Sequence, residues 1–189
     1  MKTHVLFRTF VFSLLIHLFP LVASAQIPPP AMQIAQSVWK QFASTEGGFT
    51  VLFPGIPQEA AVPLNTPSGQ VSLRIFAADR PGQAAYFVSY ADFPAAVLRF
   101  DTNTLLNGVV NGAVRNVQGT ILSQQAINVA GFPGRETRVQ AAGGKILRYR
   151  TFLVNQRLYQ IVVETTPGAE MNLNGSIQGF FNSFKLLAR

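Results

Sequence analysis

The chain has 189 residues, of which 48% are hydrophobic and 12% charged, and it carries a formal net charge of +7. It contains no cysteine, which excludes a disulfide framework, a thiol nucleophile and cysteine-ligated metals. The length fits one ordinary domain with enough chain to bury a core.

The N-terminal segment has the pattern of a secretory signal peptide. Lys2 and Arg8 form a basic start, residues 10–22 are mostly apolar, and Ala23-Ser24-Ala25 matches a cleavage site, so residues 1–25 are predicted to be removed. Cleavage would take away both histidines, His4 and His17, and lower the basic count from 15 to 13 against 8 acids, a net charge of +5. The apolar stretch is shorter than the roughly 20 residues that span a bilayer, so an uncleaved anchor is the second choice and the mature chain has no predicted span.

A short linker is expected after the cleavage site. Three consecutive prolines, 28–30, favour extended polyproline II backbone, and residues 26–38 are predicted to form a Pro-rich N-terminal segment. Within 31–42 the apolar residues recur at three- and four-residue steps, which fits one or two helical turns, but the residues around Trp39 equally fit the start of a strand. Both readings stay open.

Four strands are predicted next. Residues 49–53 are β-branched and aromatic and stop at a Pro-Gly turn. The runs 60–64 and 70–78 flank a turn-forming stretch and suggest a hairpin, and 84–91 forms a further strand.

Residues 102–117 predict the clearest helix. An apolar stripe runs along it, Asp101 or Thr102 is suited to cap its start, and a glycine stands beyond its end. Gly108 and Gly112 lie four residues apart at the edge of the stripe, where they are expected to permit close packing on a sheet.

The rest of the chain repeats the strand pattern and ends in a helix. Strands are predicted over 120–129, 135–141, 145–154 and 157–165, with a turn at 131–134 and a last helix over about 174–185. The order of strands, helix, strands, helix predicts an α+β domain with a mostly antiparallel sheet and flanking helices.

Four stretches carry a resemblance to a known family: 48–57 (GFTVLFPGIP), 131–136 (GFPGRE), 157–160 (RLYQ) and 181–184 (FNSF). Over roughly residues 39–186 the chain resembles small exported bacterial proteins, cyanobacterial ones among them, similar in layout to the PsbP/Mog1-like αβα sandwich. The resemblance implies a single domain over 39–189 and a cofactor-free accessory protein that binds a membrane complex in a periplasm, a thylakoid lumen or the extracellular space. It implies a binding role and no enzymatic one.

Most catalytic chemistry has no matching residues. Without histidine or cysteine in the mature chain, Ser/His/Asp and Cys/His systems and histidine-ligated zinc are excluded. A Ser-x-x-Lys string at 37–40 lacks its companion motifs, and no phosphate-binding loop is present. The eight acids are isolated in sequence, so a carboxylate-dependent hydrolase, whose acids converge only in the fold, remains as the alternative.

Basic side chains on the late strands form the one candidate site. Arg148 and Arg150 share a strand face, and three further basic residues lie on or near neighbouring strands. The proposed patch for an anionic partner consists of Arg135, Arg138, Lys145, Arg148 and Arg150. The competing reading pairs these residues with Glu136 and Glu164. The sequence thus predicts a non-catalytic binding domain for a protein partner, with a lipid- or polyanion-binding module as another alternative and with no nucleic-acid partner, because the basic residues form no run.

Overall fold

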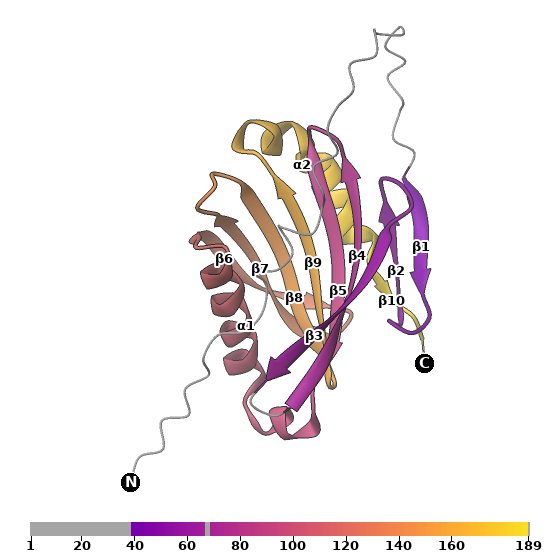
Figure 1. Cartoon of the computed structure of the whole chain (residues 1–189), viewed down its shortest axis with the longest axis vertical. Coiled ribbons are helices and arrows are strands. Elements are labelled where there is room, and N and C mark those ends of the chain that lie inside the picture. The colour runs from indigo at the N-terminus through magenta and orange to yellow at the C-terminus, as the bar shows by residue number, and fades with distance from the viewer. Residues whose placement is uncertain (1–38, 67–68, 189) are drawn as a thin grey trace, which may run out of the picture.

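The computed structural model describes residues 39–66 and 69–188 (Figure 1). The predicted signal peptide, 1–25, and the linker, 26–38, lie outside the described residues. Within the described ranges, every helix is too short or too polar to span a bilayer.

A seven-stranded antiparallel sheet forms the centre of the fold (Figure 1). Its strands lie in the order β3-β4-β5-β9-β8-β7-β6, and every neighbouring pair is antiparallel. They are β3 (Gln58–Thr66), β4 (Gly69–Arg80), β5 (Ala84–Asp92), β6 (Thr120–Val129), β7 (Phe132–Gln140), β8 (Ile146–Val154) and β9 (Arg157–Thr165). The predicted α+β class with a mostly antiparallel sheet is confirmed.

A second, three-stranded sheet has the order β1-β2-β10. It consists of β1 (Lys40–Ser44), β2 (Phe49–Phe53) and β10 (Lys185–Leu186). Of the two predictions for the segment around Trp39, the strand is correct for 40–44. Strand pairing puts the aromatic side chain of Phe42 on the core, against Phe49, Phe53 and Phe76. Residues 31–38 of that ambiguous segment lie outside the described part.

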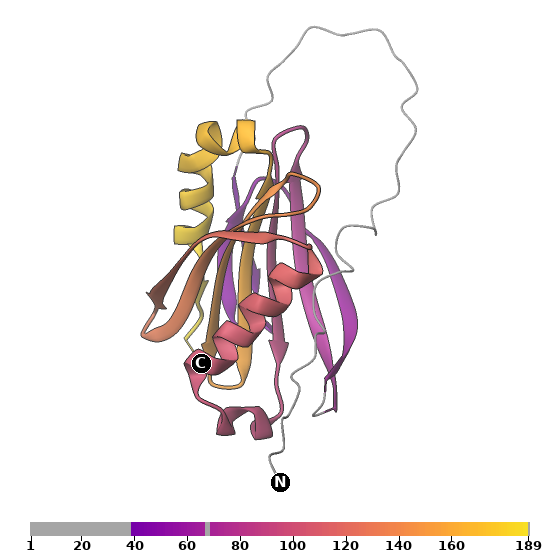
Figure 2. The ribbon, with the colours of Figure 1, turned by 90° about the vertical axis from the view of Figure 1, so that its left-hand side faces the viewer.

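The helices cover opposite faces of the large sheet (Figure 2). Helix α1 (Thr102–Asn116) packs on β7 and β8, and the side chain of Asp101 accepts a hydrogen bond from Thr104 N, as predicted for its cap. Helix α2 (Pro167–Ser183) packs on β8 and β9 from the other face and also contacts β2. A short 3₁₀ helix, η1 (Ala95–Arg99), connects β5 to α1.

The main core lies between the large sheet, the small sheet and α2, and it is aromatic. Phe49, Phe53, Tyr86, Phe152 and Phe180 are fully buried in it. Phe49 of β2 stacks on Phe184, which follows α2, at a ring-centroid distance of 5.3 Å, so the two ends of the described chain are joined through the core.

The last helix begins earlier than the apolar pattern predicts. It starts at Pro167, where the Thr166 side chain accepts a hydrogen bond from Ala169 N at 3.3 Å. Exposed residues such as Met171 hide these first turns from a periodicity argument. At the other end, the predicted helical residue Lys185 pairs instead with Thr50 of β2.

Two turn and glycine predictions also change. The turn predicted over 131–134 lies instead at Ala130 and Gly131, which have positive φ. Strand β7 begins directly after it, so Pro133 is already a strand residue. Proline is tolerated there because pairing with β8 begins only at Gly134. Gly108 and Gly112 do not mediate close packing, since a Cβ at either position would meet nothing within 4 Å.

Candidate functional site

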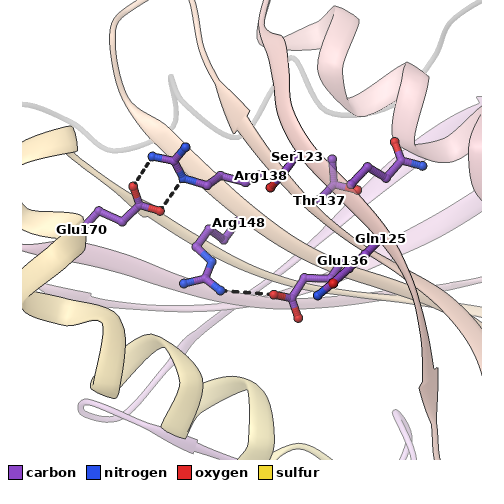
Figure 3. Close-up of a pocket in the computed structure, with 8 residues that line it drawn as sticks. Ser123, Gln125, Glu136, Thr137, Arg138, Arg148 and Glu170 are labelled. Atoms are coloured by element: carbon purple, nitrogen blue, oxygen red, sulfur yellow. Dashed lines mark hydrogen bonds and ion pairs between the residues drawn. The ribbon is translucent and has the colours of Figure 1, made fainter.

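A groove of about 330 Å³ lies along the α2 face of the late strands (Figure 3). The sheet supplies Glu136 and Arg138 from β7 and Arg148 from β8, α2 supplies Glu170, and polar residues of β6 line the remaining side. Alternation along the antiparallel strands puts the charged residues on one face, because Glu136 and Arg138 are two apart and stand opposite Arg150 and Arg148.

Arg138 and Glu170 form a bidentate ion pair that joins β7 to the first turn of α2. Arg138 Nε donates to Glu170 Oε1 at 2.7 Å and Nη2 donates to Oε2 at 2.5 Å (Figure 3). The hydrogen bond from Arg138 holds the pKa of the Glu170 carboxyl below its usual value. In return, Glu170 raises the pKa of Arg138.

Glu136 is held between two arginines. Arg148 Nη2 donates to its Oε1 at 3.2 Å, and Arg150 Nε donates to its Oε2 at 2.7 Å. The three side chains are between 13% and 18% exposed, so they form a charged network that is largely shielded from water, and two of them, Glu136 and Arg148, line the groove.

Helix α2 completes the coordination of the two arginines. Arg148 donates to Asn174 Oδ1 at 3.0 Å, and Arg150 donates to Asn182 Oδ1 at 3.0 Å. Both guanidinium groups also lie over the Phe181 ring, with the Cζ of Arg150 at 4.8 Å from the centroid. Three of the predicted patch residues, Arg138, Arg148 and Arg150, therefore connect α2 to the sheet.

The structure divides the five predicted patch residues. Arg138, Arg148 and Arg150 lie together on the α2 face. Arg135 is on the opposite face, where it donates to Asn107 and Asn103 of α1. Lys145 lies in the loop before β8 and pairs with Glu164.

The alternative of internal pairing describes these contacts well. Glu136 and Glu164 are both partners, as that reading expected, and Glu170 is a third partner that it did not include. Glu170 could have been found only by recognising Thr166-Pro167 as a helix start, which puts the carboxylate in the first turn.

Two carboxylates, Glu136 and Glu170, line the groove, as the hydrolase alternative requires. Their protonation and hydrogen bonding do not suit acid–base catalysis. A general acid needs a raised pKa and a nucleophile needs an accessible oxygen. Glu170 has a lowered pKa, and Glu136 accepts hydrogen bonds from arginines at both oxygens. In the described part of the chain, no group of three His, Cys, Asp or Glu side chains is placed to hold a metal ion.

Comparison with known proteins supports the fold. No family model matches the chain and no curated protein matches it. The solution structure of cyanobacterial PsbP (CyanoP) from Synechocystis sp. PCC 6803 superposes with a TM-score of 0.58 at 10% identity, covering 84% of this chain and 98% of that one. A protein of unknown function from Pseudomonas aeruginosa, PA94, titled a putative regulator, gives a TM-score of 0.39 at 15% identity over 80% of this chain and 97% of that one.

The fold and the groove together define the structural class of this chain. The chain has the PsbP-like α+β fold, and the charged side chains that line its groove form ion pairs with one another or with Arg150. The resemblance seen in the sequence is confirmed at the level of this fold.

Proposed function

We propose that this chain is an exported, non-catalytic accessory domain that binds a protein partner belonging to a membrane complex, in a periplasm, thylakoid lumen or extracellular space. The observation that carries the proposal is the state of the groove. Its carboxylates and guanidinium groups neutralise one another, so it is suited to present a rigid polar surface and poorly suited to move protons. The PsbP-like fold and the sequence pattern of a signal peptide support the same role.

The anionic-partner hypothesis enters this proposal in a narrower form. Of the three arginines on the α2 face, Arg138 is the most exposed, at 38%, so it is the one best placed to meet a carboxylate or phosphate of the partner. Such a group must compete with Glu170 for the same guanidinium. We therefore expect the arginines to add specificity to a contact that neutral groups make, because charge pairs already satisfied within one protein add little affinity.

A pull-down from membranes of the native host tests the role. The chain, expressed from its full coding sequence, is immobilised and exposed to mildly solubilised membranes at low and at moderate salt. Recovery of the same membrane complex at both salts supports the accessory role. An empty bait at both salts would contradict it. Recovery of lipid and polyanions only at low salt would also contradict it and would favour an anionic-surface binder.

Variants separate the groove from general charge. Arg138→Ser is compared with Arg99→Ser, which removes the same charge from an exposed position at the end of η1. Loss of the complex with Arg138→Ser alone assigns the contact to the groove. A third variant, Arg148→Ser/Arg150→Ser, is tested for retention on heparin and anionic vesicles. If Arg138→Ser and Arg99→Ser retain the complex equally and the third variant is retained like the wild type, the arginines have no part in the contact.

A further inference from the structure

The outer edge of β6 lacks the usual protection of an edge strand. Within the described residues, β6 ends the seven-stranded sheet and pairs only with β7 (Figure 1). Its ten residues, TILSQQAINV, include no charged residue and no proline. The opposite edge strand, β3, contains Glu59 and Pro63, which are typical guards against edge-to-edge pairing.

The edge is also accessible. Residues 120–126 are exposed on both faces of the sheet, and the element that β6 packs against is β7. A bulge between Ile121 and Ser123 interrupts the start of the ladder, so the regular part of the edge runs from 123 to 129. Among the described residues no other strand lies beside this edge, so an approaching strand could pair with it directly.

The distribution of charge indicates what the edge accepts. Each of the other six strands of this sheet has at least one charged residue, and the whole chain carries a formal net charge of +7. Two copies with a net positive charge repel each other overall, and within this sheet the uncharged strand β6 allows the approach with the least local repulsion. The side-chain amides of Gln124 and Asn128 each donate and accept, so these two residues are complementary when a second copy of the strand pairs antiparallel about Ala126.

We propose that the chain forms a two-fold dimer in which residues 123–129 of β6 pair antiparallel with the same residues of a second copy. An isologous contact of this kind closes at two copies and hides both edges. The symmetry axis is perpendicular to the joined sheet, so both grooves open on the same face. This assembly goes beyond the proposed function and does not depend on it.

Single cysteines test the pairing directly, because the chain has none of its own. Each exposed position of β6 from Ser123 to Ala126 is replaced by cysteine in turn, and the purified chain is oxidised at low concentration. Antiparallel self-pairing puts one position nearest the axis, so that variant should crosslink to a dimer much faster than Ala61→Cys on the exposed edge strand β3. Crosslinking that is no faster in β6 than at Ala61 overturns the proposal.

Introducing a charge into β6 gives a second, independent measurement. Ala126→Lys and Ala126→Glu should each weaken dimerisation about tenfold or more in analytical ultracentrifugation, because residue 126 stands opposite its own copy at the two-fold axis and like charges then meet there. Mixing the two variants should restore the dimer, whereas Ala61→Lys should leave it unchanged. A wild-type chain that stays monomeric at high concentration, even if its β6 edge captures a strand of another protein, overturns the proposal.

Discussion

Arg157 joins the β1–β2 turn to the end of β5 through one guanidinium group. It donates twice to Asp92, at 2.6 Å each, and once to Glu46 O at 2.6 Å, and it lies 4.5 Å from the centroid of the Tyr90 ring. Its side chain is 11% exposed. We expect Arg157→Ala to lower the free energy of unfolding by about 2 kcal/mol, because charged hydrogen bonds and packing are lost together. Urea unfolding measures this, with exposed Arg99→Ala as the control that should change stability by less than about 0.5 kcal/mol.

Glu170 gives the chain a stability contribution that depends on pH. Because Arg138 holds its pKa below the ordinary value of 4.5, the contribution is complete above that pH and is lost as pH falls through the lower, folded-state pKa. Glu170→Gln should therefore be less stable than the wild type by about 1 kcal/mol at pH 7, a modest figure because Arg138 is partly exposed. The difference should shrink towards zero as the pH falls below 4.5 and through the lower, folded-state pKa, measured by urea unfolding across pH; a difference independent of pH would contradict the ion-pair explanation.

At the scale of elements, the first turn of α2 depends on its cap. Thr166 satisfies the backbone of Ala169, and the same turn presents Glu170 to β7. Thr166→Ala should destabilise the fold by about 1 kcal/mol. Asn172→Ala, at an exposed position of the same helix, should be neutral or slightly stabilising because alanine has the higher helix propensity. Thermal melts of the two variants distinguish a capping effect from a general effect of alanine.

At the scale of the whole molecule, the aromatic core predicts behaviour at alkaline pH. All four tyrosines are buried, and burial raises the pKa of Tyr86 and Tyr149 and raises that of Tyr90 to about 12. The folded state then keeps protons that the unfolded state releases above pH 10, so stability should fall as pH rises from 10 to 12. Tyrosinate absorbance should be low in the folded protein at pH 11 and rise on unfolding. Early ionisation of Tyr86, Tyr90 and Tyr149 would contradict the described packing.

Much of the fold could be predicted from local signals. Residues 49–53 and 157–165 are strands with the predicted bounds, and α1 differs from its prediction by one residue at its end. Strong alternation and a recognisable cap settle such elements without tertiary contacts. The start of α2 was predictable in principle from Thr166-Pro167, but its exposed first turns have no apolar period. The pairing of Lys185 with Thr50 was not predictable, because it depends on a strand far away in the sequence.

The candidate site shows the same division. The sequence by itself determined that no cysteine chemistry is available, that the fold is α+β, and that Arg148 and Arg150 share a face, since strand residues two apart always do. By the same rule Arg135 and Arg138, three apart on one predicted strand, lie on opposite faces. Only the tertiary structure decided that Glu170, 32 residues from Arg138, neutralises it. It also decided that the uncharged strand β6 is an edge. Strand order and partner choice follow from packing between distant segments, and a single strand's residue pattern does not encode them.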